Sequence, residues 1–204
     1  MIFAYNREHV GDVLMVIVEN DHQLEQKVER KANVAEITTI DGTIVGYNFF
    51  DVSSYLTIEG QGQVVISDDQ LAVLNEQLKQ AGFTNQLQAD HTPKFMVGFV
   101  KSCEAHPDSD HLSITEIDFA DAHEPLQIVC GAPNIRKNLK VVVALPGAMM
   151  PDGLMIWPGE LRGVKSYGMI CSARELHLPN APMKRGILEL AADAVVGSSF
   201  TPGK

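Results

Sequence analysis

Short apolar runs separated by polar turns fill the first part of the chain. Asp12–Val18 is one such run, and Val34–Ile40 and Thr43–Phe50 are two more. Asp41–Gly42 lies between the last two, and this dipeptide favours the positive φ angles of a tight hairpin turn. With a shorter run at Gln63–Ile66, the pattern predicts four strands, two of them joined as a hairpin.

A helix is predicted directly after these strands. Ser67–Gln70 has the form of a capping box, in which the serine and glutamine side chains each bond a backbone N–H group of the other residue. Gly82 marks the end of the helix. Four apolar residues fall on one face, which we interpret as core packing: Leu71, Leu74, Leu78 and Ala81. Residues 1–88 are therefore predicted to form an α+β domain, and the sequence assigns it no role.

The rest of the chain predicts a different fold. Residues 84–94 lack periodicity and include Pro93, so we place a linker there. Within residues 89–204, Ser172–Leu178 predicts a short helix of one or two turns. Five strands are predicted between Gly- and Pro-rich turns: Met96–Glu104, Leu112–Phe119, Leu126–Cys130, Lys140–Leu145 and Gly186–Leu190. Five short strands with a short helix are typical of an all-β OB-fold barrel.

The charge of the chain is uneven. The formal net charge of −10 argues against a nucleic-acid partner at first sight. However, residues 1–90 hold 5 Lys and Arg against 14 Asp and Glu, whereas residues 91–204 hold 11 against 12. The acidity is almost confined to the first domain, so the second can carry a local basic face.

Cysteine usage and the N-terminus indicate a cytoplasmic protein. Three widely spaced cysteines, Cys103, Cys130 and Cys171, do not suit a disulfide framework and favour a reducing compartment. The N-terminus has no signal peptide, and the apolar run Val13–Val18 is far too short for a membrane span. No membrane association is expected.

Two segments invite a chemical interpretation that we do not favour. His106–His111 contains two His and two Asp residues, but its spacing fits no common metal site and Pro107 forbids a regular helix, so we interpret it as a turn. Cys171 lies before a predicted helix start, where a thiol pKa can fall, yet no catalytic signature surrounds it. We expect no catalytic residue, no metal and no cofactor.

Two further segments combine small residues, cations and backbone freedom. Ile128–Arg136 is a buried strand that enters a Gly/Pro/Asn turn ending on Arg136 and Lys137, and Leu161–Met169 has the same character. Both are typical of loops that present backbone and short side chains to a large partner.

Together with three other segments, they carry a family resemblance. The ordered series resembles the tRNA-binding OB domain near the start of the bacterial phenylalanyl-tRNA synthetase β subunit: His106–Leu112, Gln127–Arg136, Val143–Gly147, Leu161–Ser172 and Gly186–Leu190. The synthetase subunit continues for hundreds of residues, whereas an acidic domain precedes the module here. That layout is similar to the stand-alone bacterial tRNA-binding proteins of the YtpR type.

The resemblance implies which residues contact RNA. The Arg-Gly-Val-x-Ser-x-Gly-Met segment of the family corresponds to Arg162–Met169. Ser166 can bond a phosphate or 2′-hydroxyl, Gly168 allows close backbone approach, and Met169 offers an apolar contact. Arg162 and Lys165 would neutralise phosphates. Three residues of the earlier loop are second-rank candidates: Asn134, Arg136 and Lys137.

One departure lowers the expected affinity. His111 stands where the family usually has Lys, and His is largely neutral at pH 7, so one cation is lost.

The sequence therefore predicts a non-catalytic tRNA-binding protein that recognises RNA shape and backbone. The alternative is a protein-interaction module, in which the acidic residues 1–88 dock on a synthetase or another partner. A homodimer is compatible with both hypotheses.

Overall fold

The structure is a computed structural model, and it describes residues 1–88 and 90–203. The chain divides into two compact units, Met1–His91 and Thr92–Lys204. Each unit has its own hydrophobic core. No helix in the described residues is long and apolar enough to cross a membrane.

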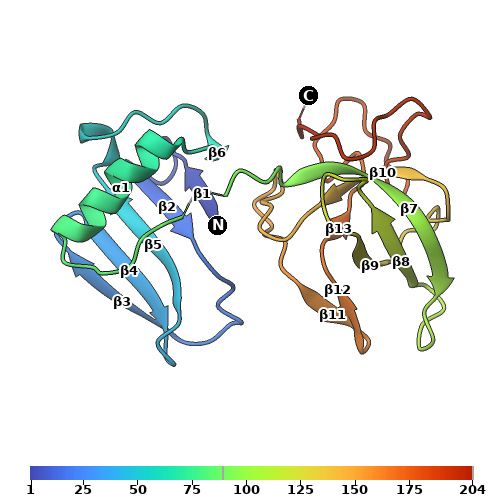
Figure 1. Ribbon diagram of the computed structural model, residues 1–204, viewed down its shortest axis with the longest axis horizontal. Coiled ribbons are helices and arrows are strands. Elements are labelled where there is room, and N and C mark those ends of the chain that lie inside the picture. The colour runs from blue at the N-terminus through green and yellow to red at the C-terminus, as the bar shows by residue number, and fades with distance from the viewer. Residues whose placement is uncertain (89, 204) are drawn as a thin grey trace. The chain divides into compact units, whose positions relative to one another are not determined.

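The first unit is a two-layer α+β structure. Its six-stranded antiparallel sheet has the order β3-β4-β5-β2-β1-β6, and helix α1 covers one face of the sheet (Figure 1). A 3₁₀ turn, Val52–Ser54, follows β5. The elements are β1 (Ile2–Tyr5), β2 (Val13–Ile17), β3 (Gln26–Lys31), β4 (Val34–Thr39), β5 (Ile44–Phe50), β6 (Gly62–Gln63) and α1 (Asp68–Gln80).

The predicted capping box starts α1. The Ser67 hydroxyl accepts a hydrogen bond from the Gln70 N–H, and the Gln70 side chain accepts one from the Ser67 N–H. The apolar face of the helix buries Leu71, Leu74 and Leu78 in the core of the sheet. Each leucine contributes roughly 1.5–3 kcal/mol through the apolar surface it removes from water. The α+β prediction is confirmed.

The apolar pattern did not reveal every strand of this sheet. β1 has only four residues, and β3 (sequence QKVERK) is an exposed edge strand whose polar residues show no alternation. Pairing with β4 decides the conformation of β3. The predicted strand Gln63–Ile66 is shorter than expected, because only Gly62 and Gln63 pair with β1.

The second unit is a nearly closed barrel. Its five-stranded sheet has the order β13-β10-β7-β8-β9, and a two-stranded hairpin, β11–β12, extends from it (Figure 1). The elements are β7 (Phe95–Ala105), β8 (Ser113–Asp118), β9 (Leu126–Cys130), β10 (Lys140–Ala144), β11 (Gly159–Leu161), β12 (Val164–Ser166) and β13 (Met169–Ile170).

The segment Val164–Ile170 closes the barrel. Its end pairs with β10 through Met169 and Ile170, while its beginning bonds β9. The Tyr167 N–H donates to the Gln127 carbonyl at 2.9 Å, and the Gln127 side chain donates to the Lys165 carbonyl at 2.8 Å. The resulting circular order, β7-β8-β9-β12/β13-β10, confirms the OB-type barrel.

One part of the predicted barrel differs from expectation. Gly186–Leu190 is not a regular strand, because only an isolated bridge joins Glu189 to Val141 of β10. The fifth barrel strand is instead β13, which has two residues and therefore no readable periodicity. Ser172–Leu178, predicted as a helix of one or two turns, forms a single turn that is closed by the hydrogen bond from the Leu176 N–H to the Ser172 carbonyl.

Apolar side chains lie on both sides of β10. The barrel interior holds one cluster, centred on Val141, Val143, Ile117 and Ile128. Val142 and Ala144 belong to a second cluster with Cys171 and Leu176, which packs the C-terminal segments against the outside of the barrel. This second cluster positions the chain after β13.

Candidate nucleic-acid interface

Side chains of β12 and of Tyr167 directly after it alternate between the barrel interior and the surface. Lys165 and Tyr167 are exposed, whereas Ser166 between them is 5% exposed. This is the period-two pattern of a strand that lies on a core. Lys165 and Tyr167 therefore form an outward row beside Gln127 of β9, which is also exposed.

Ser166 has a structural contact in this position. Its hydroxyl accepts a hydrogen bond from the Val129 N–H at 3.1 Å and lies 3.4 Å from the Gly168 carbonyl. The bond joins β12 to β9 at the point where the barrel closes. For Ser166 to contact RNA as predicted, its buried hydroxyl would have to give up the hydrogen bond from Val129.

Gly168 and Met169 connect the outward row to the barrel wall. Gly168 has a φ of 131°, and a Cβ atom there would lie 2.8 Å from the Ala144 carbonyl oxygen, so a larger residue is excluded. Met169 is half-buried and packs against the second cluster while it also lines a surface groove. Its position is compatible both with core packing and with the predicted contact with RNA.

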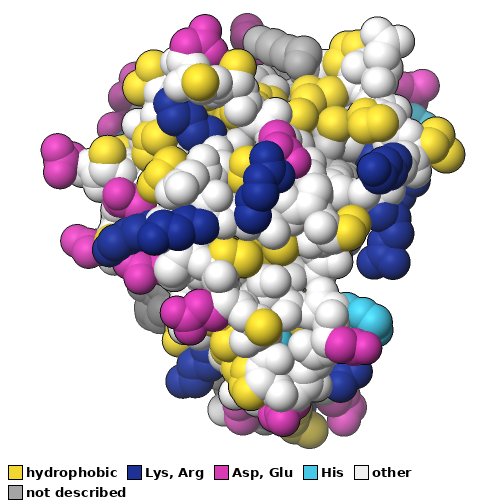
Figure 2. Space-filling model, turned by 90° about the vertical axis from the view of Figure 1, so that its right-hand side faces the viewer, with side chains coloured by type: hydrophobic (Ala, Val, Ile, Leu, Met, Phe, Trp, Pro, Cys, Tyr) yellow, Lys and Arg dark blue, Asp and Glu magenta, His cyan; other side chains and the backbone are white. Residues whose placement is uncertain are grey.

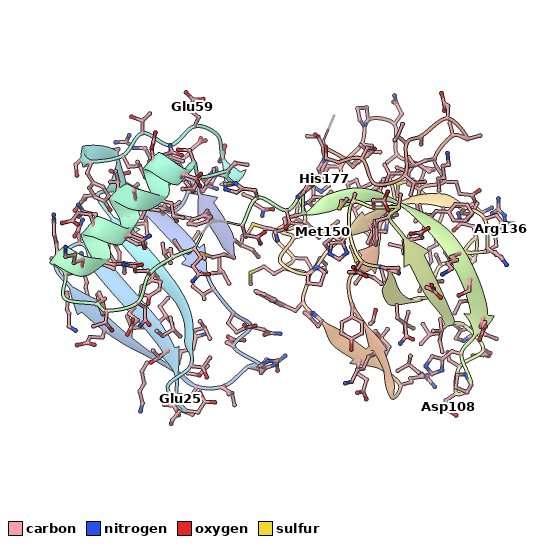
Figure 3. The ribbon with its side chains drawn as sticks, viewed as in Figure 1. Glu25, Glu59, Asp108, Arg136, Met150 and His177 are labelled. Atoms are coloured by element: carbon pink, nitrogen blue, oxygen red, sulfur yellow. The ribbon has the colours of Figure 1, made fainter. Side chains whose placement is uncertain are left out.

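Arg162 lies at the tip of the β11–β12 hairpin. Arg162 and Gly163 have φ angles of 47° and 82°, as in the mirror-image turns that join tight hairpins. The Arg162 guanidinium donates to the Asp108 carbonyl at 3.0 Å, and the His106 ring lies 3.2 Å from the Leu161 carbonyl. These contacts fix the hairpin on the β7–β8 loop, at the end of the barrel where Figure 3 shows Asp108.

A groove of about 580 Å³ lies beside β13, between the end of β9 and the segments that follow β13. One wall is the end of β9 with the following turn, and Met169 and Ile170 contribute to the base. The second wall comes from the segments after β13. Three cations line the groove: Arg174, Lys184 and Arg185.

These three groove cations are exposed, and their charged groups have no bonding partner among the described residues. Within residues 1–88 and 90–203, no side-chain hydrogen bond or ion pair engages Arg174, Lys184 or Arg185. The two carboxylates that line the same groove are engaged. Glu175 accepts the Ser172 N–H at 2.7 Å, and Glu189 is paired with Arg136. The groove therefore offers positive charge to an anionic ligand.

Asn134, Arg136 and Glu189 form a charge-balanced cluster, which we call the Glu189 clasp. Arg136 donates to both carboxylate oxygens of Glu189, at 2.7 and 3.0 Å, and Asn134 donates to one of them at 2.9 Å. The Arg136 bonds, followed by the Asn134 bond, lower the pKa of Glu189 to about 2. Glu189 therefore remains ionised at neutral pH and occupies the guanidinium fork.

The clasp also fixes the second wall of the groove. The Asn134 side-chain amide accepts the Ile187 N–H at 2.9 Å and donates to the Ile187 carbonyl at 3.1 Å. A Cβ atom at Gly186 would lie 2.8 Å from the Asn134 side-chain oxygen, so glycine permits this approach. Asn134 thus acts on Ile187 much as a neighbouring strand would.

The structure distributes the predicted residues over three places. Asn134 and Met169 line the groove, Lys165 lies on the outward row that leads to it, and Arg162 lies at the hairpin tip. Lys137 is exposed but does not line the groove. The sequence interpretation missed Arg174, Lys184 and Arg185. The adjacent pair Lys184–Arg185 beside Gly186 was the available signal, although nothing local in the sequence placed it opposite β9.

In Figure 2, which shows the side of the molecule at the right of Figure 1, Lys and Arg side chains cross the middle of the face. Most Asp and Glu side chains in that view lie toward the edges. Figure 3 shows Arg136 at the right-hand side of the second unit and Asp108 below it, near the lower tip of the unit.

The structure also describes the two segments for which the sequence suggested other chemistry, Cys171 and the turn at His106–His111. Cys171 is fully buried, and burial raises the pKa of its thiol to about 12, so the thiol is protonated at neutral pH. His106 is buried in the predicted turn, where its Nδ1 accepts the Asp108 N–H. That bond places the ring proton on Nε2, which then donates to the Leu161 carbonyl.

Comparisons with known proteins agree with this architecture. The family model described as "Putative tRNA binding domain" matches residues 95–199, and a "Domain of unknown function (DUF4479)" matches residues 21–90. The "Putative tRNA-binding protein YtpR" of Bacillus subtilis (strain 168) is 45% identical over 197 residues, which cover 96% of this chain and 97% of that protein.

Synthetase subunits match the second unit more than the first. The phenylalanine–tRNA ligase β subunit of Streptococcus thermophilus (strain CNRZ 1066) is 42% identical over 69% of this chain, and that of Oceanobacillus iheyensis is 48% identical over 50%. The chain spans only 18% and 12% of these subunits. With the barrel, its closing segment and both family matches in the same order, this chain belongs to the YtpR-like family, whose second unit is a tRNA-binding OB domain.

Proposed function

We propose that this protein binds tRNA through the groove of its second unit and the adjoining outward row, and that it catalyses no reaction. The observation that carries the proposal is the set of three exposed, uncommitted cations in a groove whose carboxylates are already engaged. Family membership supplies the ligand class, because the related protein from Bacillus subtilis is named for tRNA binding.

The number of cations sets the expected strength of binding. Arg174, Lys184, Arg185 and Lys165 can neutralise up to about four phosphates, so the logarithm of the affinity should fall with the logarithm of salt with a slope of about −2 to −4. A slope of this size goes with micromolar affinity. It also fits recognition of RNA shape and backbone, in which few base edges are read.

The absence of catalysis rests on the state of the candidate groups. The pKa of about 12 keeps the Cys171 thiol unreactive, and two backbone groups, the Asp108 N–H and the Leu161 carbonyl, engage both ring nitrogens of His106. With tRNA as ligand, we place the protein in the cytoplasm. The acidic residues 1–88 are proposed as a separate functional domain that docks on a synthetase or mediates a homodimer.

Titration of labelled tRNA at several salt concentrations tests the proposed function. We expect saturable binding at low salt and the shallow slope given above. Absence of saturable binding at low salt would refute it. Retention of the protein by a synthetase from nuclease-treated extract, without any direct tRNA binding, would favour the protein-interaction alternative instead.

A further inference from the structure

Tyr167 is unusual among the aromatic residues of this chain. Within the described residues it is the one Phe, Tyr or Trp side chain that is exposed, with 36% of its surface accessible. The other three tyrosines are buried or bonded: Tyr5 and Tyr47 lie in the core, and the Tyr55 hydroxyl donates to the Phe50 carbonyl. No side-chain hydrogen bond engages the Tyr167 hydroxyl in the same described range.

The backbone holds Tyr167 in a fixed position. Its N–H donates to the Gln127 carbonyl at 2.9 Å, and the residue before it, Ser166, is buried and bonded to Val129. Gly168 follows under the close approach of the Ala144 carbonyl. An exposed aromatic ring on a closed barrel wall loses little conformational freedom when a ligand covers it, because the backbone is already ordered.

The neighbours of Tyr167 suit a nucleotide. Lys165 lies on the same outward row and places an ammonium group where a phosphate could pair with it. Met169 follows two residues later and lines the cationic groove. An aromatic face next to cations binds the flat base of a nucleotide while the cations bind its backbone.

From these observations we infer that Tyr167 is a stacking site for one unpaired RNA base. The inference rests on the proposed function and narrows its ligand class. A duplex keeps both faces of each base covered, whereas loops, bulges and single-stranded ends can present a free base to an aromatic ring. The favoured ligand is therefore RNA that offers an unpaired base beside its backbone, rather than an uninterrupted duplex.

The test compares Tyr167→Ala, Tyr167→Leu and Tyr167→Phe in the full chain. For tRNA and for a short single strand, Ala should weaken binding by about 5- to 100-fold, since stacking on one base contributes roughly 1–3 kcal/mol. Phe should restore most of the affinity, and Leu should not, because Leu supplies apolar bulk without a π face. Binding to a blunt RNA duplex of similar length should change less than about twofold, because only backbone contacts remain there.

A fluorescent base gives a second readout. A single strand that carries 2-aminopurine should lose fluorescence when it binds the wild type, and it should retain most of that fluorescence at saturation with Tyr167→Leu. Leu154→Ala, a change at another exposed apolar residue of the same unit, is the matched control and should leave every measurement unchanged.

The outcomes separate this inference from the proposed function. If the wild type binds tRNA and all three variants bind equally well, the stacking site is wrong and the proposed function stands. An equal loss with single strand and duplex, together with lower thermal stability, would show that Tyr167 supports the barrel and does not stack. If the wild type binds no tRNA at all, both proposals fail.

Discussion

The second unit carries two groups of cations that differ in what they already bind. Arg136 makes three hydrogen bonds within the Glu189 clasp or beside it, and its charge is matched by a carboxylate. Arg174, Lys184 and Arg185 line the groove with no such partner in the described residues. A formal charge near neutral therefore conceals a groove that is locally positive. Internal pairing, rather than the number of Lys and Arg residues, decides which cations a phosphate can reach.

The largest expected effect on tRNA binding follows from removing the three groove cations. Replacing Arg174, Lys184 and Arg185 together by Ala should weaken tRNA binding by about a hundredfold at low salt and reduce the salt slope by about 2–3. These exposed residues contribute little to packing, so thermal stability should not change. Salt-dependent titration and a melting curve measure both quantities, and an unchanged slope would show that RNA binds elsewhere.

Ser166 tests whether a residue of the family motif acts on the fold or on the ligand. Ser166→Ala removes the acceptor of the buried Val129 N–H and should cost about 1–3 kcal/mol of the free energy of unfolding. The folded variant should keep its tRNA affinity within about twofold. Urea unfolding followed by titration separates the two effects. Normal stability with a large loss of affinity would instead make Ser166 a direct RNA contact.

Glu189→Gln should release the Arg136 guanidinium from its ion pair. Without the carboxylate, Arg136 is free to pair with a phosphate, and the affinity for tRNA should rise about threefold with a salt slope steeper by nearly 1. The double variant Glu189→Gln/Arg136→Gln is the matched control and should lose this gain. A weaker affinity in the single variant would mean that the clasp matters only through the groove wall.

The same variant gives a pH dependence. The pKa of Glu189 is held at about 2, below its ordinary value of 4.5. The ionised carboxylate therefore stabilises the fold fully above pH 4.5, and this contribution is lost as the pH falls from 4.5 toward 2. The wild type should melt above Glu189→Gln at pH 6, and the difference should shrink through this window. A constant difference from pH 6 to pH 2.5 would contradict the pairing.

Lys137 should show the smallest effect. It is exposed, but it lies outside both the groove lining and the clasp. Lys137→Ala should change tRNA affinity by less than about twofold, as is usual for a screened surface charge. An effect as large as that of a single groove cation, measured with Lys184→Ala in parallel, would extend the interface past the turn after β9.

Local signals predicted the parts of the fold that local interactions make. The capping box and the leucine face of α1 are confirmed because both depend on residues within one or two turns of helix. The four longest barrel strands are confirmed for the same reason, since each alternates or stays apolar over five or more residues. β3 and β13 were not predicted because pairing with another strand, not their own composition, makes them strands: β3 pairs with the adjacent β4, and β13 pairs with the more distant β10.

The two-unit layout, the barrel class and the family could be predicted from the sequence, because they depend on ordered motifs and on apolar patterning. The roles of single residues depend on tertiary contacts. Ser166 is buried and Tyr167 is exposed because β12 packs on the barrel core. Arg136 is paired because the fold brings Glu189, which is distant in sequence, next to it. The groove joins β9 to Lys184 and Arg185, more than fifty residues later, and chain topology alone brings those charges together.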